Sequence, residues 1–176
     1  MHAEFIAYAG DCRVRGTIDR EQGVRLSDIL NAVDDITLRD AELTSHADGH
    51  VVHLDEVTLG RDDLYAVEAI GGRGEAARRL HTVKHRLQIK LGPYVVLGYL
   101  HSLPGNEPLV SIGKRAPMIP LTTATIAFSD GPAIDAHDVD ALIINRAMVD
   151  WVRPGETDLS AFGLRLPESA FRNALG

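Results

Sequence analysis

The chain has 176 residues, of which 45% are hydrophobic and 24% charged, a balance that is typical of a folded globular protein and excludes disorder as its main state. Its 25 acidic residues outnumber the 18 basic ones, so the net charge of -7 excludes the global positive field on which non-specific nucleic-acid binders depend. The single cysteine, Cys12, makes neither an intramolecular disulfide nor a thiolate metal cage. Without a secretion signal or an apolar run of ~18 residues, the sequence predicts a cytoplasmic protein that does not enter the membrane.

An internal repeat organises the chain. The repeated glycines are Gly10, Gly16 and Gly23 in the first copy and Gly92, Gly98 and Gly105, 82 positions later, in the second. Apolar residues follow in the same order, with a displacement of 83 between Ile36 and Ile119 and of 84 between Leu59 and Ile143. We therefore predict a duplicated domain, because a run of matched apolar positions in one order is hard to obtain by chance.

The first unit, residues 1–70, has a hydrophobic period of two. Phe5 and Ala7 alternate with Ile6 and Tyr8, and this spacing is typical of strands. The pair Asp48-Gly49 predicts a tight two-residue hairpin before a strand at 51–54, and residues 27–31 predict a short helical turn. About five short strands in so few residues favour a small, strongly bent barrel, with the repeated glycines at its bends.

A basic connector, residues 71–86, follows, and residues 74–86 predict the best helix of the chain. Ala76, Leu80 and Val83 lie on one stripe, and the arginines lie largely on the other side. The second unit, residues 87–152, repeats the strand pattern of the first. A tail, residues 153–176, has apolar side chains at Phe162, Leu164, Leu166 and Phe171, which predict that it docks on a surface.

Two stretches of the first unit resemble the half-motifs of Sm-like (LSm) proteins. Val14-Arg15-Gly16-Thr17-Ile18 and the strand at 36–43 resemble the first half-motif, and residues 57–67 resemble the second. The second unit repeats both, and the fold class is thus mostly β: two tandem five-stranded Sm-like barrels joined by a short basic helix. The resemblance implies rings closed by pairing of edge strands, with RNA bound by a polar loop and an Arg-Gly turn. Here that turn reads Gly60-Arg61 and Asn145-Arg146.

Positive side chains of the connector and of the two turns are the candidate RNA-binding residues. They are Arg61, Arg73, Arg78, Arg79, Lys84, Arg86 and Arg146. A cluster of this kind neutralises phosphates, although a solvated helix face has the same composition.

Other chemistry has weaker signals. Gly72-x-Gly74-x-x-Ala77 has the glycine spacing of a dinucleotide fingerprint, but the ribose-binding carboxylate about 20 residues further on is missing. His46, His50 and His53 surround one hairpin, and His81 and His85 have a helical spacing that suits zinc, but neither group has an evident complete ligand set. We predict no catalytic, metal or cofactor site, because no motif places a nucleophile beside a base.

The leading hypothesis is a non-enzymatic scaffold or adaptor that forms homo-oligomers and binds a further protein. Since each chain supplies two barrels, a ring closed edge to edge contains an even number of barrels, most simply six from three chains. The alternative is an RNA-binding regulator that uses the candidate residues above. A third hypothesis is an enzyme whose site is assembled only in three dimensions.

Overall fold

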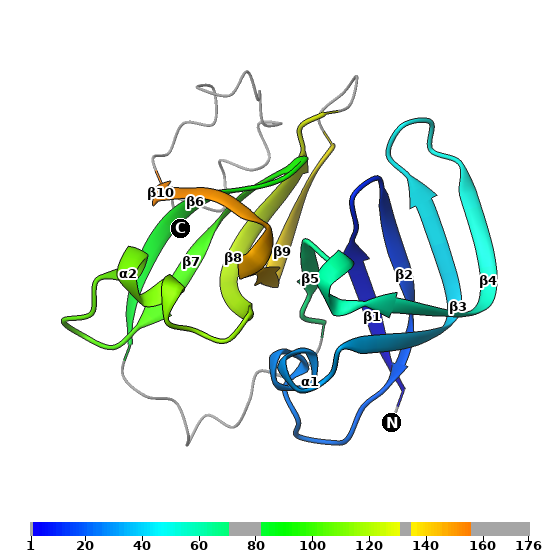
Figure 1. The fold of residues 1–176 in the computed structure, drawn as a ribbon, viewed down its shortest axis with the longest axis horizontal. Helices are drawn as coiled ribbons and strands as arrows, with labels where there is room; N and C mark the ends of the chain where they lie inside the picture. The colour runs from blue at the N-terminus through cyan, green and yellow to red at the C-terminus, as the bar shows by residue number, and fades with distance from the viewer. Residues whose placement is uncertain (1, 71–81, 131–134, 156–176) are drawn as a thin grey trace.

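The structure is a computed structural model that describes residues 2–70, 82–130 and 135–155, which form ten strands, two short α-helices and two 3-10 turns (Figure 1). The first half contains β1 (His2–Tyr8), β2 (Cys12–Asp19), α1 (Leu26–Ala32), β3 (Asp35–Ser45), β4 (Val51–Gly60), η1 (Arg61–Asp63) and β5 (Ala66–Glu68). The second half contains β6 (Val83–Leu91), β7 (Tyr94–Ser102), α2 (Pro108–Gly113), β8 (Met118–Phe128), β9 (Asp135–Asn145), η3 (Arg146–Met148) and β10 (Val149–Pro154).

All ten strands belong to one antiparallel sheet, with the order β10-β6-β7-β8-β9-β5-β1-β2-β3-β4. The prediction of a mostly β protein is confirmed. The sheet is open, with β10 and β4 as its two end strands, rather than a pair of separate closed barrels. The two halves meet where β5 pairs with β9, in the middle of the order.

The strand registers repeat between the halves. Phe5 pairs with Gly16 in the first half, as Leu87 pairs with Gly98, 82 positions later, in the second. Ile36 pairs with Leu59, as Ile119 pairs with Ile144. Leu59 therefore corresponds to Ile144, 85 positions later, and the displacement of 84 predicted for this stretch is wrong by one residue. The 3-10 turns that begin at Arg61 and at Arg146 have the same displacement of 85.

Each half bends sharply at equivalent places. Gly16 and Gly98 lie at register shifts between the second and third strands of their halves, and a Cβ at either position would lie 3.1 to 3.2 Å from the nearest atoms of the facing strand. Opposite them, Asp40 and Thr123 have positive φ, a conformation that side chains of this kind rarely adopt. The glycine repeat in the sequence thus marks the bends, as expected.

Each half has a core cluster that also includes residues of the other half. The first core cluster is centred on Phe5, Leu30 and Leu38, but it includes Met118 and Ile143 from the second half. The second cluster reciprocally includes residues from β1 and β5, namely Ile6, Tyr8 and Ala66. The cores interlock across the junction between the halves.

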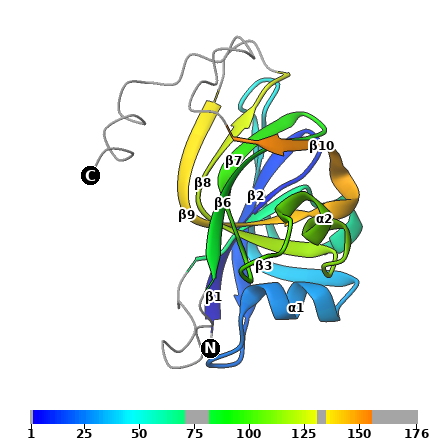
Figure 2. The same cartoon turned by 90° about the vertical axis from the view of Figure 1, so that its left-hand side faces the viewer.

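Both short helices lie on the same side of the sheet (Figure 2). The turn predicted at 27–31 is confirmed as α1, which buries Leu26 and Leu30. Sequence analysis missed α2, which begins with Pro108 at a position where the missing N–H costs nothing, and buries Ile112. None of the helices in the described residues is long and apolar enough to cross a membrane.

The predicted connector helix is wrong at its C-terminal end. Residues Val83 to Arg86 belong to β6 and pair with β7 from Ser102 to Tyr99, and residues 71–81 lie outside the described part of the chain. Sequence alone favoured a helix because the stripe continued into this stretch, but the ladder with β7 overrides local propensity. The second unit therefore begins before residue 87.

The predicted two-residue hairpin at Asp48-Gly49 is also wrong. The main chains of Ser45 and His50 bond to each other across a longer loop, in which only Gly49 has positive φ. The carboxylate of Asp48 accepts a hydrogen bond from the His50 N–H, which lowers the pKa of Asp48. This side-chain bond stabilises the loop in place of a tight turn.

Candidate functional site

The two turn arginines support the local structure. The guanidinium of Arg61 is 16% exposed, lies 3.2 Å from the Asp34 carboxylate and donates to the Val33 carbonyl. Arg146 donates to the Gly113 carbonyl over 2.6 Å. Both side chains are therefore engaged in bonds that hold the turns to the neighbouring loop.

The other candidate RNA-binding residues do not form one cluster with the turns. Lys84 and Arg86 lie on β6, next to the end strand β10. Arg73, Arg78 and Arg79 lie outside the described residues, as do the glycines of the dinucleotide-like motif and His81. The described part of the chain thus places the two turn arginines and the β6 residues at different elements.

The histidines predicted to surround one hairpin go to different places. His46 Nε2 lies 2.9 Å from the Tyr94 hydroxyl, and its ring stacks on Phe128 with centroids 4.3 Å apart. His53 lies 3.8 Å from the Glu42 carboxylate. In the described residues no three metal-ligating side chains come together.

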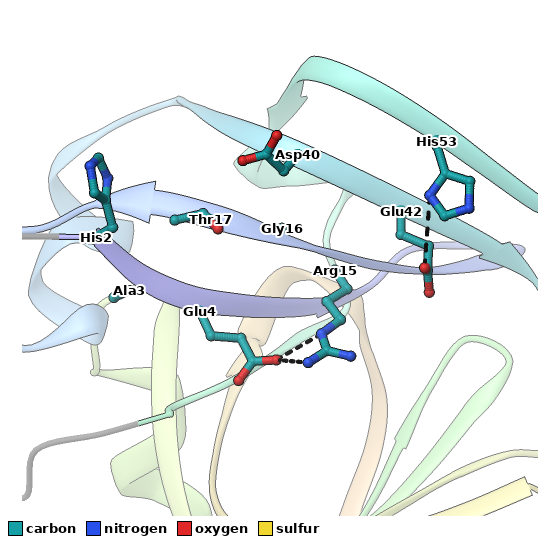
Figure 3. A pocket seen from close by; sticks show the side chains of 9 residues that line it. All are labelled: His2, Ala3, Glu4, Arg15, Gly16, Thr17, Asp40, Glu42 and His53. Carbon is teal, nitrogen blue, oxygen red and sulfur yellow. Dashed lines mark hydrogen bonds and ion pairs between the residues drawn. The ribbon is translucent and has the colours of Figure 1, made fainter.

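A hollow of about 510 Å³ lies on the outer face of β1, β2 and β3 (Figure 3). Some of the charged side chains that line it contact one another. Arg15 contacts Glu4 over 2.5 Å, and His53 faces Glu42. The Arg15 guanidinium, the one Arg or Lys side chain in the lining, is already held by Glu4, so this hollow has no free guanidinium or ammonium with which to hold an anion.

The junction between the halves is held by main-chain hydrogen bonds. Ala66, Val67 and Glu68 of β5 pair with Ile144, Ile143 and Leu142 of β9. The Asn145 N–H donates to the Tyr65 carbonyl, and the Ala69 N–H donates to the Ala141 carbonyl, both over 2.9 Å. The main-chain groups of successive residues in a strand point alternately to its two neighbours. These bonds therefore show that Ala141, Ile143 and Asn145 direct their main-chain groups at β5.

Buried side chains reinforce this junction. Asn145, only 1% exposed, donates from Nδ2 to the Leu64 carbonyl over 3.0 Å and accepts from the Ala147 N–H. Asn31 of α1 reaches across to β8, where its amide exchanges two hydrogen bonds with the main chain of Met118. The sequence analysis did not predict a role for either asparagine, because no sequence motif indicates an amide side chain that bonds to the main chain of the other half.

A charged group is also buried next to the junction. Glu68 accepts a hydrogen bond from the Tyr8 hydroxyl over 2.7 Å and lies 3.3 Å from the Arg13 guanidinium. Burial, and then the hydrogen bond to Glu68, raises the pKa of Tyr8 well above its ordinary value. The tyrosine therefore remains a neutral donor at all working pH values.

Aromatic rings close one end of the junction. Tyr94 of the second half donates to the Ala9 carbonyl of the first, and its ring meets those of Tyr8 and Tyr65 at centroid distances of 5.6 Å. Burial raises the pKa of Tyr94 as well. These contacts join the halves with both apolar area and hydrogen bonds.

The end strands β4 and β10 are the counterparts of β9 and β5. A displacement of 85 relates β4 to β9 and β5 to β10, so each half contributes one strand to the junction and leaves the other at an end of the sheet. Figure 1 shows β4 and β10 on opposite sides of the molecule. Within the described residues, β4 and β10 each pair with a strand on one side alone. These edges are the candidate functional site.

The two edges carry opposite charges. The exposed acidic residues of β4, the adjacent β3 and η1 are Asp35, Asp40, Asp55, Glu56, Asp62 and Asp63, against one exposed basic residue, Arg39 of β3, so this edge has a net negative charge. The basic residues on β10 and the adjacent β6 are Lys84, Arg86, Lys90 and Arg153, against one acidic residue, Asp150 of β10, so this edge has a net positive charge. Apolar side chains at Val51, Val52 and Leu54 of β4 are also about 40% exposed. An unpaired edge with such a pattern is a template for a further strand.

Comparisons with known protein families, with curated proteins and with solved structures find no match to this chain.

Proposed function

We propose that this protein is a non-enzymatic scaffold that assembles head to tail, with β10 of one chain pairing with β4 of the next. Each half would act as one strongly bent, five-stranded, Sm-like unit. The repeated order of five strands, β5-β1-β2-β3-β4 and β10-β6-β7-β8-β9, supports this division.

The pairing of β5 with β9 supports the proposal, because it is the same edge-to-edge pairing already formed within one chain. Transferring its register by 85 positions predicts that Trp151, Val152 and Arg153 pair with Leu59, Thr58 and Val57 of the next chain. Val152 and Thr58 would then exchange main-chain hydrogen bonds, as Val67 and Ile143 do.

Charge complementarity favours a second copy as the partner. An acidic β4 edge and a basic β10 edge attract each other head to tail and repel their own kind. Lys84 and Arg86, two of the candidate RNA-binding residues, lie on the basic side and are assigned to this contact.

A head-to-tail contact of this kind closes into a ring if the rotation per chain allows it, and otherwise produces a filament. A ring would contain an even number of units, and three chains with six units is the simplest arrangement. Such a ring offers repeated surfaces to a protein partner, which is the scaffold function.

The test uses two proline variants. Thr58→Pro removes a main-chain N–H from the outer side of β4, and Val152→Pro removes one from the outer side of β10. In neither case is the ladder to the inner neighbour affected, because N–H groups alternate along a strand. We expect each variant to remain folded by circular dichroism and to be monomeric by native mass spectrometry, whereas the wild type forms an oligomer.

Mixing the variants is the decisive step. A Thr58→Pro chain keeps an intact β10, and a Val152→Pro chain keeps an intact β4, so the mixture should form 1:1 dimers and nothing larger. A wild-type monomer, or variants that still assemble, would contradict the proposal. Nuclease treatment of the wild type distinguishes the alternative: loss of bound mass would support an RNA-binding regulator.

A further inference from the structure

A second hollow, of about 260 Å³, lies between α1 and the strands β1, β2 and β3, and we call it the α1 hollow. Figure 1 shows α1 at the end of the first half that also holds the N-terminus. The apolar side chains that line the α1 hollow are Ile18, Ile29, Val33 and Ile36. Sites for drug-sized ligands have volumes of roughly 300–1,000 Å³, so the α1 hollow fits one long side chain better than a whole cofactor.

An arginine occupies the equivalent place in the second half. Arg115 follows the end of α2, and its side chain is half-buried. Its Nε donates to the Ser111 hydroxyl over 3.3 Å, and its Nη2 donates to the main-chain carbonyl of His101. The guanidinium therefore lies between α2 and the end of β7.

The residues that make up this arginine site have counterparts in the wall of the α1 hollow. At a displacement of 82, the counterparts of Arg115, Ser111 and His101 are Val33, Ile29 and Asp19. Because valine is short and uncharged, it leaves open the space that a guanidinium takes in the second half. The α1 hollow therefore has the position of an arginine side chain that the first half does not supply.

Charged side chains surround the mouth of the α1 hollow. His2 and Arg39 both contact the Asp19 carboxylate, at 2.7 and 3.2 Å. Asp35 is exposed, and its carboxylate makes no ion pair with any described residue. A free carboxylate beside an apolar wall suits a side chain with an apolar stem and a positive head.

We propose that the α1 hollow binds an arginine side chain of a protein partner. The guanidinium would pair with the Asp35 carboxylate and donate to the main-chain carbonyl of Asp19, and the stem would pack on Ile29 and Val33. A guanidinium suits this site better than an ammonium, because its planar fork donates to two acceptors at once. Binding needs one chain alone, so the inference does not depend on the head-to-tail contact.

An NMR titration of the full-length protein with N-acetyl-L-argininamide tests the proposal. We expect saturable shifts of the amide signals of Ile29, Val33 and Thr37, with a dissociation constant on the order of 1 mM for so small a ligand. The control ligand is N-acetyl-L-citrullinamide, which has nearly the same shape but no charge. It should bind about fivefold more weakly, and equal binding of the two ligands would contradict recognition of a cation.

Two variants locate the binding. Val33→Arg fills the α1 hollow from within, as Arg115 does in the second half, and should abolish the shifts. The matched control Ala32→Arg adds the same charge at the exposed last residue of α1, which does not line the hollow, and should change the dissociation constant by less than about threefold. Asp35→Asn keeps the shape of the site and should weaken binding about fivefold.

Asp35→Asn also keeps the test valid if Val33→Arg fails to fold. Wild-type affinity in either variant, or a wild type whose signals do not shift, would overturn the proposal. An apparent affinity for the argininamide that falls as the protein concentration rises would assign the α1 hollow to a second copy, which also overturns it.

Discussion

The junction of β5 with β9 and the free edges β10 and β4 are two versions of one arrangement. At the junction, Ile143 and Met118 enter the core of the other half. At the equivalent positions of the free edge, the chain has Thr58 and Asp35, both exposed. The backbone pattern is the same, but the side chains that would interlock are polar at the edge.

The opposite side of the junction shows the same replacement. Ile6 and Tyr8 belong to the core cluster of the second half. Their counterparts beside β10, at a displacement of 82, are Gln88 and Lys90, and the Lys90 ammonium donates to Ser129 over 2.7 Å. An apolar junction resembles a permanent interface, and a polar one suits contacts that form and separate, so the proposed assembly would have one fixed joint within the chain and one reversible joint between chains.

Proline substitution at the fixed joint should have the largest effect. Ile143→Pro removes the N–H that β9 directs at β5 and disturbs a fully buried position, so we expect a loss of about 3 kcal/mol or more in unfolding free energy. The matched variant Thr58→Pro at the free edge should cost at most about 1 kcal/mol in the monomer. Urea denaturation measures the unfolding free energy of both variants. Similar losses in the two variants would contradict the difference between the junction and the free edge.

Removal of the buried amide at the junction should come next. Asn145→Ala leaves the Leu64 carbonyl without its partner, and we expect a loss of about 1–3 kcal/mol. The control Asn106→Ala, in an exposed loop, should change stability by less than about 0.5 kcal/mol. If the two alanine variants unfold at the same urea concentration, the amide does not stabilise the joint.

The bends should respond alike in the two halves. Gly16→Ala places a Cβ 3.1 Å from the Arg39 carbonyl, and Gly98→Ala places one 3.2 Å from Leu121, so each should lose about 1–2 kcal/mol by overpacking. Gly113→Ala has no atoms within 4 Å of the new Cβ and should be neutral or slightly stabilising. Thermal unfolding of the three variants decides this, and a large loss in one half alone would mean that the bends differ.

The smallest effect is a pH dependence of stability that arises from His101 in the second half. His101 contacts Thr82 and Thr122, and burial, with the nearby cations of Lys84 and Arg115, lowers the pKa of His101 below its ordinary value. Since the unfolded chain then takes up the proton first, stability should fall as the pH drops below about 6.5.

His101→Gln removes this titration, so its stability should decline less than that of the wild type between pH 7.5 and pH 5.5. Urea midpoints at the two pH values measure the difference. The position 82 residues earlier is Asp19, a carboxylate that lies 3.2 Å from the Arg39 guanidinium and 2.7 Å from the His2 imidazole. An identical decline in wild type and variant would remove His101 as the cause.

Local chemistry in the sequence determined the strands, α1, the bends and the duplication. Period-two alternation reports which residues of a strand face a core, and Gly16 and Gly98 report where a Cβ would collide with the next strand. The alternation is a local pattern, and a glycine indicates a close approach whichever strand faces it, so both can be read without knowing the partners.

Only the tertiary structure decided how the strands continue into one sheet and which edges remain. The displacement of 85, the strand state of Val83 to Arg86 and the pairing of Val67 with Ile143 depend on ladders between residues far apart in sequence. The same is true of the bonds that engage Arg61 and of the burial of Asn145. A sequence pattern shows that a strand has two edges, but the partner that covers each edge is chosen by long-range packing and hydrogen bonding.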